Sequence, residues 1–307
     1  MRLFLPLTLL LFGQEPPEPS IKVDVNLVNV AFLVHDASGA LSASLSKDDI
    51  EVFEDGVKQD IRFFGRSADL PLRLALVADF SGSQEKFIKK HDRDIEKFLK
   101  TSVSPKDRAM LVCFGNHIRV VSDFSSSPAD LLDGLAEFQK GSRHFPELEP
   151  DDTREGGTAL FDALYLTALH KLLPDHAARK AIILFSDGED NSSAHDLIDA
   201  IEEAQLADST IYTVRYTESK HGRLTARNKY GTLEMDRLAN DTGGASFDAS
   251  QTDVAASLRQ VSEELRSMYD IGYITTNPAR DGTFRKLAIR VKREGFTVRT
   301  KPGYYAR

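Results

Sequence analysis

The stretch LALVADFSGSQEK, residues 74–86, decides how the middle of the chain folds. Its apolar part, Leu74–Ala78, belongs to a run typical of a strand that is buried on both faces of a parallel sheet. Asp79, Ser81 and Ser83 follow at intervals of two residues, and a helical pattern begins directly after them. Taken alone, this strand-to-helix switch fits three interpretations: a helix cap, a nucleophile or a cation site.

The same alternation of apolar strands and amphipathic helices continues over residues 70–267. It predicts an α/β fold, doubly wound around a mainly parallel sheet. Strands are expected at residues 72–78, 109–115, 118–124, 180–186, 210–216 and 245–249. Helices are expected at residues 84–101, 128–139, 159–173, 195–207, 233–243 and 252–267.

The two flanks of this region have the alternating pattern of β-strands. Residues 22–66 form one β unit, with an Asp55-Gly56 hairpin signal, and residues 268–307 form another with three short strands. Each unit has too few strands to bury a core alone. We therefore expect the two to pack together as a small β-sandwich domain with the α/β domain inserted, although two separate flaps on the α/β body are an alternative.

The first residues have the character of an export signal. Residues 1–14 have one basic residue followed by a short apolar segment, and residues 15–21 form a Pro-rich linker. This predicts an exported protein, periplasmic or secreted, with a buried N-terminal segment as the alternative. The cleavage site is poor, so an uncleaved N-terminal anchor remains an alternative; no other run is long and apolar enough to cross a membrane. The single cysteine, Cys113, lies in an apolar run and is expected to be a buried core residue.

The overall charge limits the kinds of partner. The 307-residue chain has a formal net charge of −8, which argues against non-specific attraction to nucleic acid or to anionic lipid. Divalent cations and proteins fit this balance better.

Two more oxygen-bearing side chains lie in loops between the strands and helices of the α/β region. Asp187 directly follows the strand at 180–186, and Thr158 lies in the loop that enters the helix at 159–173. In open α/β sheets, ligands bind beyond the carboxyl ends of the strands. Carboxylates and hydroxyls without His or Cys suit an oxygen-preferring cation such as Mg²⁺.

These five positions resemble a known motif. D-x-S-x-S at Asp79, Ser81 and Ser83, with Thr158 and the S-D-G at Asp187, resembles the metal-ion-dependent adhesion site of von Willebrand factor type A domains. The segment F-E-D-G-V at residues 53–57 and the closing run from L-R-S-M-Y-D-I-G-Y to K-P-G-Y-Y resemble the secreted bacterial "VWFA-related" proteins common in Acidobacteria.

The resemblance implies a role for each matched residue. Ser81 and Ser83 bind Mg²⁺ (or Mn²⁺ or Ca²⁺) directly, Thr158 directly or through water, and Asp79 and Asp187 mostly through bound waters. Neutral ligands leave the ion enough charge to attract an Asp or Glu carboxylate of a protein partner. The implied function is non-catalytic cell adhesion or assembly. The face that meets the partner is expected to include three further residues: Gly82, Gly157 and Glu189.

Two other functions stay open beside this one. A hydrolase could use the same site, although the chain has no G-x-S-x-G, H-E-x-x-H or G-x-x-x-x-G-K-[ST] motif. A structural envelope protein with an unused site is the other. The run from Asp187 is not an EF-hand loop, because Ser192 and Ile198 occupy the positions that require Gly and Glu. Most of the acidic residues near the site are expected to form a solvated rim, and a role in the choice of partner is the alternative: Glu147, Glu149, Asp151, Asp152, Glu155 and Glu189.

Overall fold

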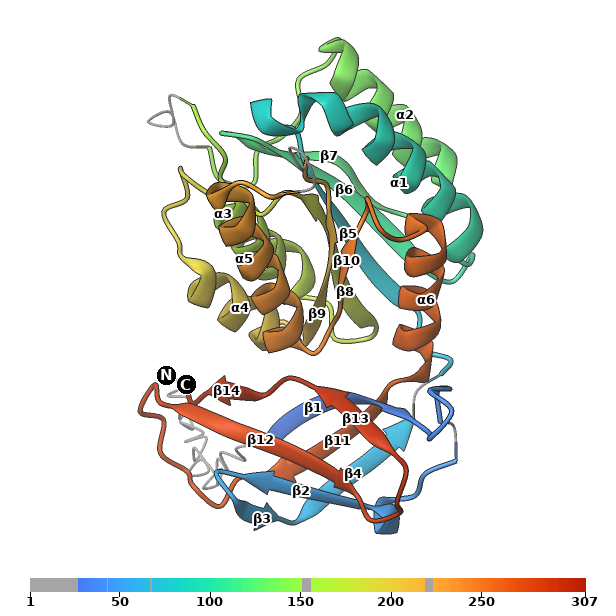
Figure 1. Cartoon of the computed structure of the whole chain (residues 1–307), viewed down its shortest axis with the longest axis vertical. Coiled ribbons are helices and arrows are strands. Elements are labelled where there is room, and N and C mark those ends of the chain that lie inside the picture. The colour runs from blue at the N-terminus through green and yellow to red at the C-terminus, as the bar shows by residue number, and fades with distance from the viewer. Residues whose placement is uncertain (1–26, 43, 67, 151–155, 219–222) are drawn as a thin grey trace, which may run out of the picture.

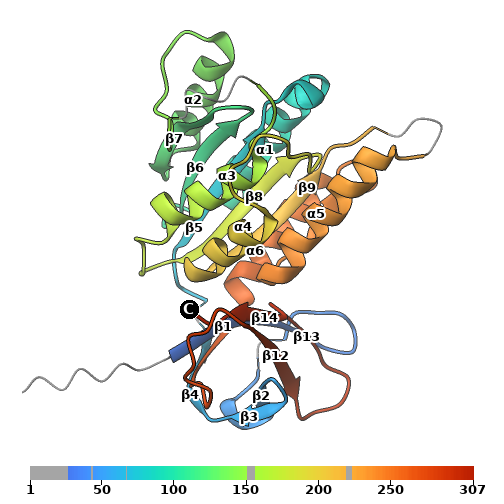
Figure 2. The same ribbon diagram turned by 90° about the vertical axis from the view of Figure 1, so that its left-hand side faces the viewer.

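The computed structural model describes residues 27–42, 44–66, 68–150, 156–218 and 223–307. The predicted signal peptide and linker lie outside these residues, as do the first residues of the N-terminal β unit. Figure 1 shows two bodies, an α/β domain above a pair of small sheets, and the last strand and the C-terminus lie where they meet (Figures 1 and 2). Among the described residues, no helix has the length and apolar character needed to cross a membrane.

The α/β domain is built on a six-stranded sheet in the order β10-β9-β8-β5-β6-β7. Neighbouring strands are parallel except β6 and β7, which are antiparallel. The central pair, β5 and β8, is buried along almost its whole length, as the continuous apolar runs predict. The strands are β5 (Leu72–Asp79), β6 (Arg108–Phe114), β7 (Ile118–Ser125), β8 (Arg179–Ser186), β9 (Ser209–Arg215) and β10 (Ser246–Asp248).

Helices cover both faces of this sheet (Figure 2). One face packs on α1 (Ile88–Ser102), α2 (Pro128–Lys140) and α6 (Val254–Ser267). The other packs on α3 (Leu160–Thr167), α4 (Leu197–Leu206) and α5 (Ala226–Thr242). Side chains of β5 alternate between the two cores, since Leu74 and Leu76 belong to the first and Ala75 and Val77 to the second. The predicted α/β class with a mainly parallel sheet is confirmed.

The second body consists of two four-stranded antiparallel sheets, and each takes strands from both flanks of the α/β region. Their orders are β13-β1-β11-β4 and β14-β12-β2-β3. One apolar cluster, which includes Phe32, Val52, Tyr269 and Ile289, joins them. The strands are β1 (Leu27–His35), β2 (Ile50–Glu54), β3 (Val57–Gln59), β4 (Ile61–Arg66), β11 (Tyr269–Ile274), β12 (Phe284–Val291), β13 (Thr297–Thr300) and β14 (Gly303–Tyr305).

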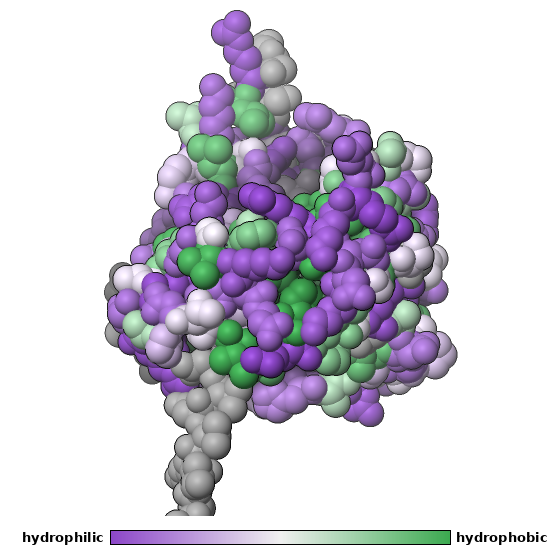
Figure 3. All heavy atoms as spheres, turned by 90° about the horizontal axis from the view of Figure 1, so that it is seen from below, coloured by the Kyte–Doolittle hydropathy of each residue, from purple (hydrophilic) through white to green (hydrophobic). Residues whose placement is uncertain are grey.

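The predicted hairpin at Asp55-Gly56 is confirmed, because β2 and β3 pair across it. Both turn residues have positive φ, 49° at Asp55 and 82° at Gly56, which suits the right-handed twist of the joined strands. Seen from below, the surface of the molecule is mainly hydrophilic, with hydrophobic side chains in small separate spots (Figure 3).

Several predicted boundaries were wrong. The helix after the opening stretch begins as a 3-10 helix, Gly82–Phe87, and becomes α-helical only at Ile88. The helix expected at 233–243 starts earlier, at Ala226, because the Thr225 hydroxyl accepts a hydrogen bond from the Asn228 amide and caps it. The last predicted strand is two strands, since Pro302 between them has no amide hydrogen to donate to a ladder.

His91 on α1 is an imidazole buried in the core without a polar partner. Its ring packs edge-on against Tyr216, with the centroids 4.3 Å apart, and neither ring nitrogen has a hydrogen-bond partner in the part of the chain that the structure describes. Burial lowers the pKa of His91 to about 3. The unfolded chain binds a proton at this histidine below about pH 6.5, whereas the folded chain does not. The stability of the fold therefore decreases as the pH falls from that value toward 3.

We expect His91→Leu to raise the free energy of unfolding by about 1–3 kcal/mol at pH 7, because it removes a buried polar group without partners. The gain should be about 2 kcal/mol larger at pH 5, where the unfolded wild type is protonated at His91. Urea unfolding at the two pH values measures both effects. Leu in place of the exposed His144 is the control and should change neither value. Equal pH dependence in the His91 variant and the wild type would contradict this account.

Candidate metal centre

Asp79 is the buried end point of β5 and lies at the carboxyl edge of the sheet. The register of β5 and β8 pairs Ala78 with Phe185, so Asp79 and Ser186 are neighbours across the two strands. One carboxylate oxygen of Asp79 accepts a hydrogen bond from the Ser186 hydroxyl at 2.6 Å, and the other from the Ser81 amide at 2.9 Å. Asp79 thus fixes the start of the turn that carries both serines.

The hydroxyls of Ser81 and Ser83 face each other above this carboxylate. Their oxygens are 3.2 Å apart. Ser81 is nearly buried, whereas Gly82 and Ser83 are exposed. Two hydroxyls within contact distance at the mouth of a buried carboxylate form the outer part of the candidate site.

Thr158 is held beside this turn from two directions. The amide of the next residue, Ala159, donates to the carbonyl oxygen of Gly115 at 2.7 Å, and Gly115 follows β6 directly and packs against the Ser81 backbone. On the other side, the Thr158 amide donates to the Asn191 side-chain oxygen at 2.8 Å. The Thr158 side chain is nearly buried, and among the described residues its hydroxyl makes no hydrogen bond.

Asp187 completes the set from the loop that follows β8. Its two carboxylate oxygens accept hydrogen bonds from the Gln84 side-chain amide at 2.7 Å and from the Glu189 backbone amide at 3.1 Å. The structure places the five residues predicted from the sequence in loops at the carboxyl edge of the sheet, where Asp79, Ser81, Thr158 and Asp187 are buried and Ser83 is exposed.

The loop after β8 is fastened to the start of α3. Asp190 accepts hydrogen bonds from the Leu160 amide at 2.8 Å and from the Ser193 hydroxyl. The buried carboxylate of Asp162 accepts from the backbone amide of His195 and from its imidazole Nδ1, at 2.9 and 2.7 Å. These contacts fix the distance between the loop of Asp187 and the loop of Thr158.

Among the described residues, no basic side chain pairs with Asp79, the most deeply buried carboxylate of the site. Burial, together with the neighbouring charge of Asp187, raises the pKa of Asp79 to about 7, although the hydrogen bonds from Ser186 and Ser81 act in the other direction. Burial and Asp187 also raise the pKa of Glu189. A bound cation would relieve both effects.

The residues predicted to meet a partner lie in different environments. Gly82 and Gly157 are exposed. Gly157 has φ +103°, and a Cβ there would lie 2.4 Å from the Asn191 side-chain oxygen, so this turn requires glycine. Glu189 is only 8% exposed, and its carboxylate pairs with the Arg227 Nε at 2.6 Å.

The expected solvated acidic rim was wrong at two positions. Glu189 is buried and paired, and Glu147 pairs with both His117 and Arg119. Residues 151–155 of the predicted rim lie outside the described residues.

The side chains present fit a small oxygen-preferring cation. The donor set consists of three hydroxyls and two carboxylates, which are ligand types that Mg²⁺ and Mn²⁺ accept. The Thr158 hydroxyl makes no hydrogen bond within the described structure. The Ser81 hydroxyl contacts both the Ser83 hydroxyl and the Asp79 carboxylate, so an ion bound by Ser81 would replace these contacts. In the described part of the chain, no group of three or more His, Cys, Asp or Glu side chains is arranged to hold a metal.

Sequence reasoning missed three residues of this region, namely Gln84, Ser186 and Asn191. Gln84 is fully buried, and its side-chain oxygen has no hydrogen-bond partner among the described residues. The sequence placed it only at the start of a helical pattern. Asn191 offered a signal, because it ends an unusually polar run, Asp187–Asn191, of the kind that hydrogen-bonds to nearby backbone.

The fold and the strand-end site define an α/β protein with a candidate cation site. No protein-family model and no curated protein matches the chain. Solved structures similar to it include BatB of Bacteroides thetaiotaomicron, 15% identical with a TM-score of 0.47, covering 63% of this chain and 97% of that one. An aerotolerance-related membrane protein of Bacteroides fragilis is 15% identical with a TM-score of 0.46, covering 64% and 100%. The mussel byssus proximal thread matrix protein 1, solved with a zinc-occupied MIDAS motif, is 16% identical with a TM-score of 0.47, covering 68% and 48%. At these values the similarity says nothing of the function of this chain.

Proposed function

We propose that this chain is an exported protein-binding module that holds a divalent ion, Mg²⁺ or Mn²⁺, and binds a carboxylate of a protein partner through it. The observation that supports the proposal is that loops at one edge of the sheet carry the Ser81, Ser83 and Thr158 hydroxyls together with the buried carboxylates of Asp79 and Asp187. In this account the hydroxyls bind the ion, and Asp79 and Asp187 hold its water ligands.

The choice of ligands explains why the ion would bind a partner. An ion whose direct protein ligands are neutral keeps most of its positive charge. The carboxylates of Asp79 and Asp187 already accept two hydrogen bonds each from the protein. In the proposal they therefore contact the ion through water, and the hydroxyls bind it directly. The exposed side of Ser83 leaves room for an outside ligand, and an Asp or Glu of another protein has the charge that the ion attracts.

Two further parts of the proposal rest on the sequence. The apolar segment within residues 1–14 supports export to the periplasm or beyond. The net charge of −8 supports a protein partner and not a nucleic acid. The module binds and does not catalyse: no motif of a nucleophile elbow, a metalloprotease or a P-loop accompanies the site.

Panning of a random peptide library on the purified chain tests this function. With 5–10 mM Mg²⁺, on the order of saturation for a site of modest affinity, selected peptides should contain Asp or Glu. Their binding should be lost in a chelator, and lost when that residue is changed to Asn or Gln. The variant Ser83→Ala should retain none of them, whereas Ser126→Ala, at an exposed serine outside the site, should retain all. Selected peptides that bind equally well in chelator would overturn the proposal.

A further inference from the structure

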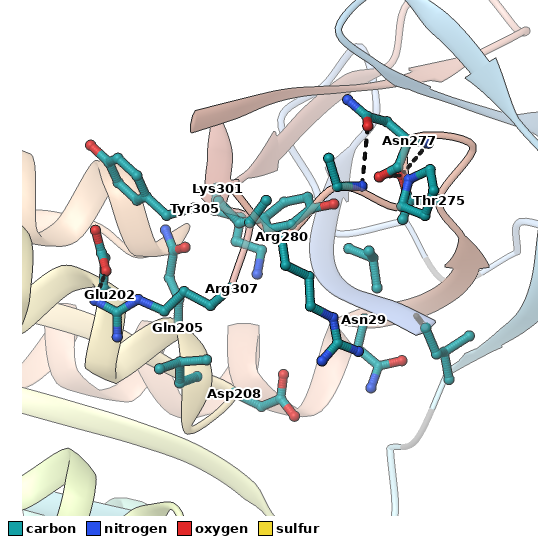
Figure 4. A pocket seen from close by; sticks show the side chains of 17 residues that line it. Asn29, Glu202, Gln205, Asp208, Thr275, Asn277, Arg280, Lys301, Tyr305 and Arg307 are labelled. Carbon is teal, nitrogen blue, oxygen red and sulfur yellow. Dashed lines mark hydrogen bonds and ion pairs between the residues drawn. The ribbon is translucent and has the colours of Figure 1, made fainter. Parts of the chain in front are cut away.

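A cleft runs between the α/β domain and the small sheets, at the end of the central sheet opposite the candidate metal centre. It consists of a hollow of about 350 Å³, shown in Figure 4, and an adjoining one of about 300 Å³. Four polar residues line both hollows: Asn29, Gln205, Asp208 and Lys301. These volumes are in the range of sites for small molecules.

The walls of the cleft are joined by polar contacts across the two bodies. The Gln205 side-chain amide, on α4, donates to the Gly303 carbonyl oxygen on β14 at 3.2 Å. Arg307 at the C-terminus pairs with Glu202 of α4. These contacts hold the two walls of the cleft together.

Lys301 brings an unpaired positive charge into this cleft. Its side chain is half-buried, and among the described residues its ammonium makes no hydrogen bond or ion pair. The ammonium lies 5.8 Å from the centre of the Tyr304 ring. Burial lowers the pKa of Lys301, and the charge of Asp208 acts in the other direction.

Asp208 brings an unpaired negative charge from the opposite wall. It follows α4 in a left-handed conformation, φ 49°, which turns the chain sharply into β9. Its carboxylate has no hydrogen bond or ion pair within the described structure. Burial raises its pKa, whereas the charges of Lys301 and Lys180, both beyond ion-pair distance, act in the other direction. The two charges do not approach within ion-pair distance of each other, and Figure 4 shows both at the same cleft.

The other charged side chains of the larger hollow are already engaged. Arg307 and Glu202 pair with each other, and Arg280 also has a partner. A simple anion would satisfy Lys301 but add repulsion at Asp208, and a simple cation would do the reverse. A molecule that carries both charges a short distance apart satisfies both walls.

We propose that this cleft binds a small zwitterion of the α-amino acid class. The carboxylate of the ligand accepts hydrogen bonds from the Lys301 ammonium, and its ammonium donates to the Asp208 carboxylate. Tyr304, Tyr305 and Leu206 line the same hollow and offer apolar surface to the side chain of the ligand. This site is independent of the proposed metal centre.

Calorimetric titration of the full chain with each of the twenty L-amino acids, one at a time, tests the proposal. At least one should bind. Its N-acetyl and amide forms each lack one charge, and their affinity should be lower by roughly tenfold or more. Binding of none of the twenty would overturn the proposal. So would a bound amino acid whose acetylated and amide forms bind as tightly.

Two variants locate the binding in the cleft. Lys301→Gln should weaken binding of the free amino acid roughly tenfold but leave binding of its amide form, which has no carboxylate, unchanged. Asp208→Asn should also weaken binding of the free amino acid roughly tenfold but leave binding of its acetylated form, which has no ammonium, unchanged. Lys97→Gln, at an exposed lysine of α1, is the control and should bind as the wild type does. Unchanged affinity in both cleft variants would place the amino acid elsewhere and contradict the assignment.

Discussion

Ser81→Ala is expected to weaken Mg²⁺ binding by about 100-fold or more, because it removes a direct ligand of the ion. Substitution of a residue that only hydrogen-bonds to a metal ligand already costs about 10–100-fold in affinity. The remaining affinity should lie at the limit of what calorimetry can measure. The variant should fold, since it keeps the hydrogen bond from the backbone amide of residue 81 to Asp79 and loses only the contacts of the Ser81 hydroxyl with Ser83 and Asp79 among the described residues. Titration of MgCl₂ and MnCl₂ into the wild type and the variant measures the effect.

The control for this experiment is Ser126→Ala. Ser126 is exposed and makes none of the contacts of the site, so its variant should bind Mg²⁺ as the wild type does. Asp79→Asn adds a graded case, because it keeps the shape of the side chain but removes the buried charge that favours a cation. Equal Mg²⁺ affinity in the Ser81 variant and the wild type would remove Ser81 from the ligand set.

Gly188→Ala is expected to lower the free energy of unfolding by about 3 kcal/mol or more and to weaken Mg²⁺ binding as well. Gly188 follows Asp187 with φ +83°, and a Cβ there would lie 2.2 Å from the Gly231 carbonyl oxygen on α5. A left-handed alanine costs about 1–2 kcal/mol, and overpacking against backbone costs about 1–3 more. The loop that carries Asp187 must move away from α5 to make room, and its carboxylate moves with it.

Gly39→Ala is a matched control that separates the cost of a positive φ from the cost of a steric clash of the new Cβ. Gly39 has the same φ of +83°, but a Cβ at that position would meet no atom within 4 Å. Gly39→Ala should therefore cost only about 1–2 kcal/mol and leave Mg²⁺ affinity unchanged. Urea unfolding and calorimetry of both variants decide the matter, and equal losses in the two would contradict the role given to the contact between Gly188 and Gly231.

The α/β sheet and the place of the candidate site could be predicted because both follow from local patterns. The apolar run that ends at Asp79 and the one that ends before Asp187 each predicted a doubly buried strand. Parallel strands bring their carboxyl ends to one edge of the sheet. The residues that follow these strands therefore lie close together, and this does not depend on where the helices begin and end. The five predicted residues lie at that edge, with Thr158 held there through Asn191.

The remainder depends on contacts between residues distant in sequence. Nothing near Gln84 indicates that its amide reaches Asp187, 103 positions further along the chain. The start of α5 was misplaced because the Thr225 cap outweighs the polar composition of the first turns of the helix. The cleft at Asp208 and Lys301 exists only after strands from both flanks have paired, and pairing of remote strands has no local sequence signal.

Anomalous diffraction from crystals of the full chain grown with Mn²⁺ tests the central claim most directly. The account predicts a peak about 2.1–2.2 Å from the hydroxyl oxygens of Ser81 and Ser83, the distance of a small divalent ion from oxygen ligands. It also predicts an open position on the side of the ion that faces solvent. A structure in which Mn²⁺ binds elsewhere, while the Ser81 and Ser83 hydroxyls stay paired with each other, would contradict the account.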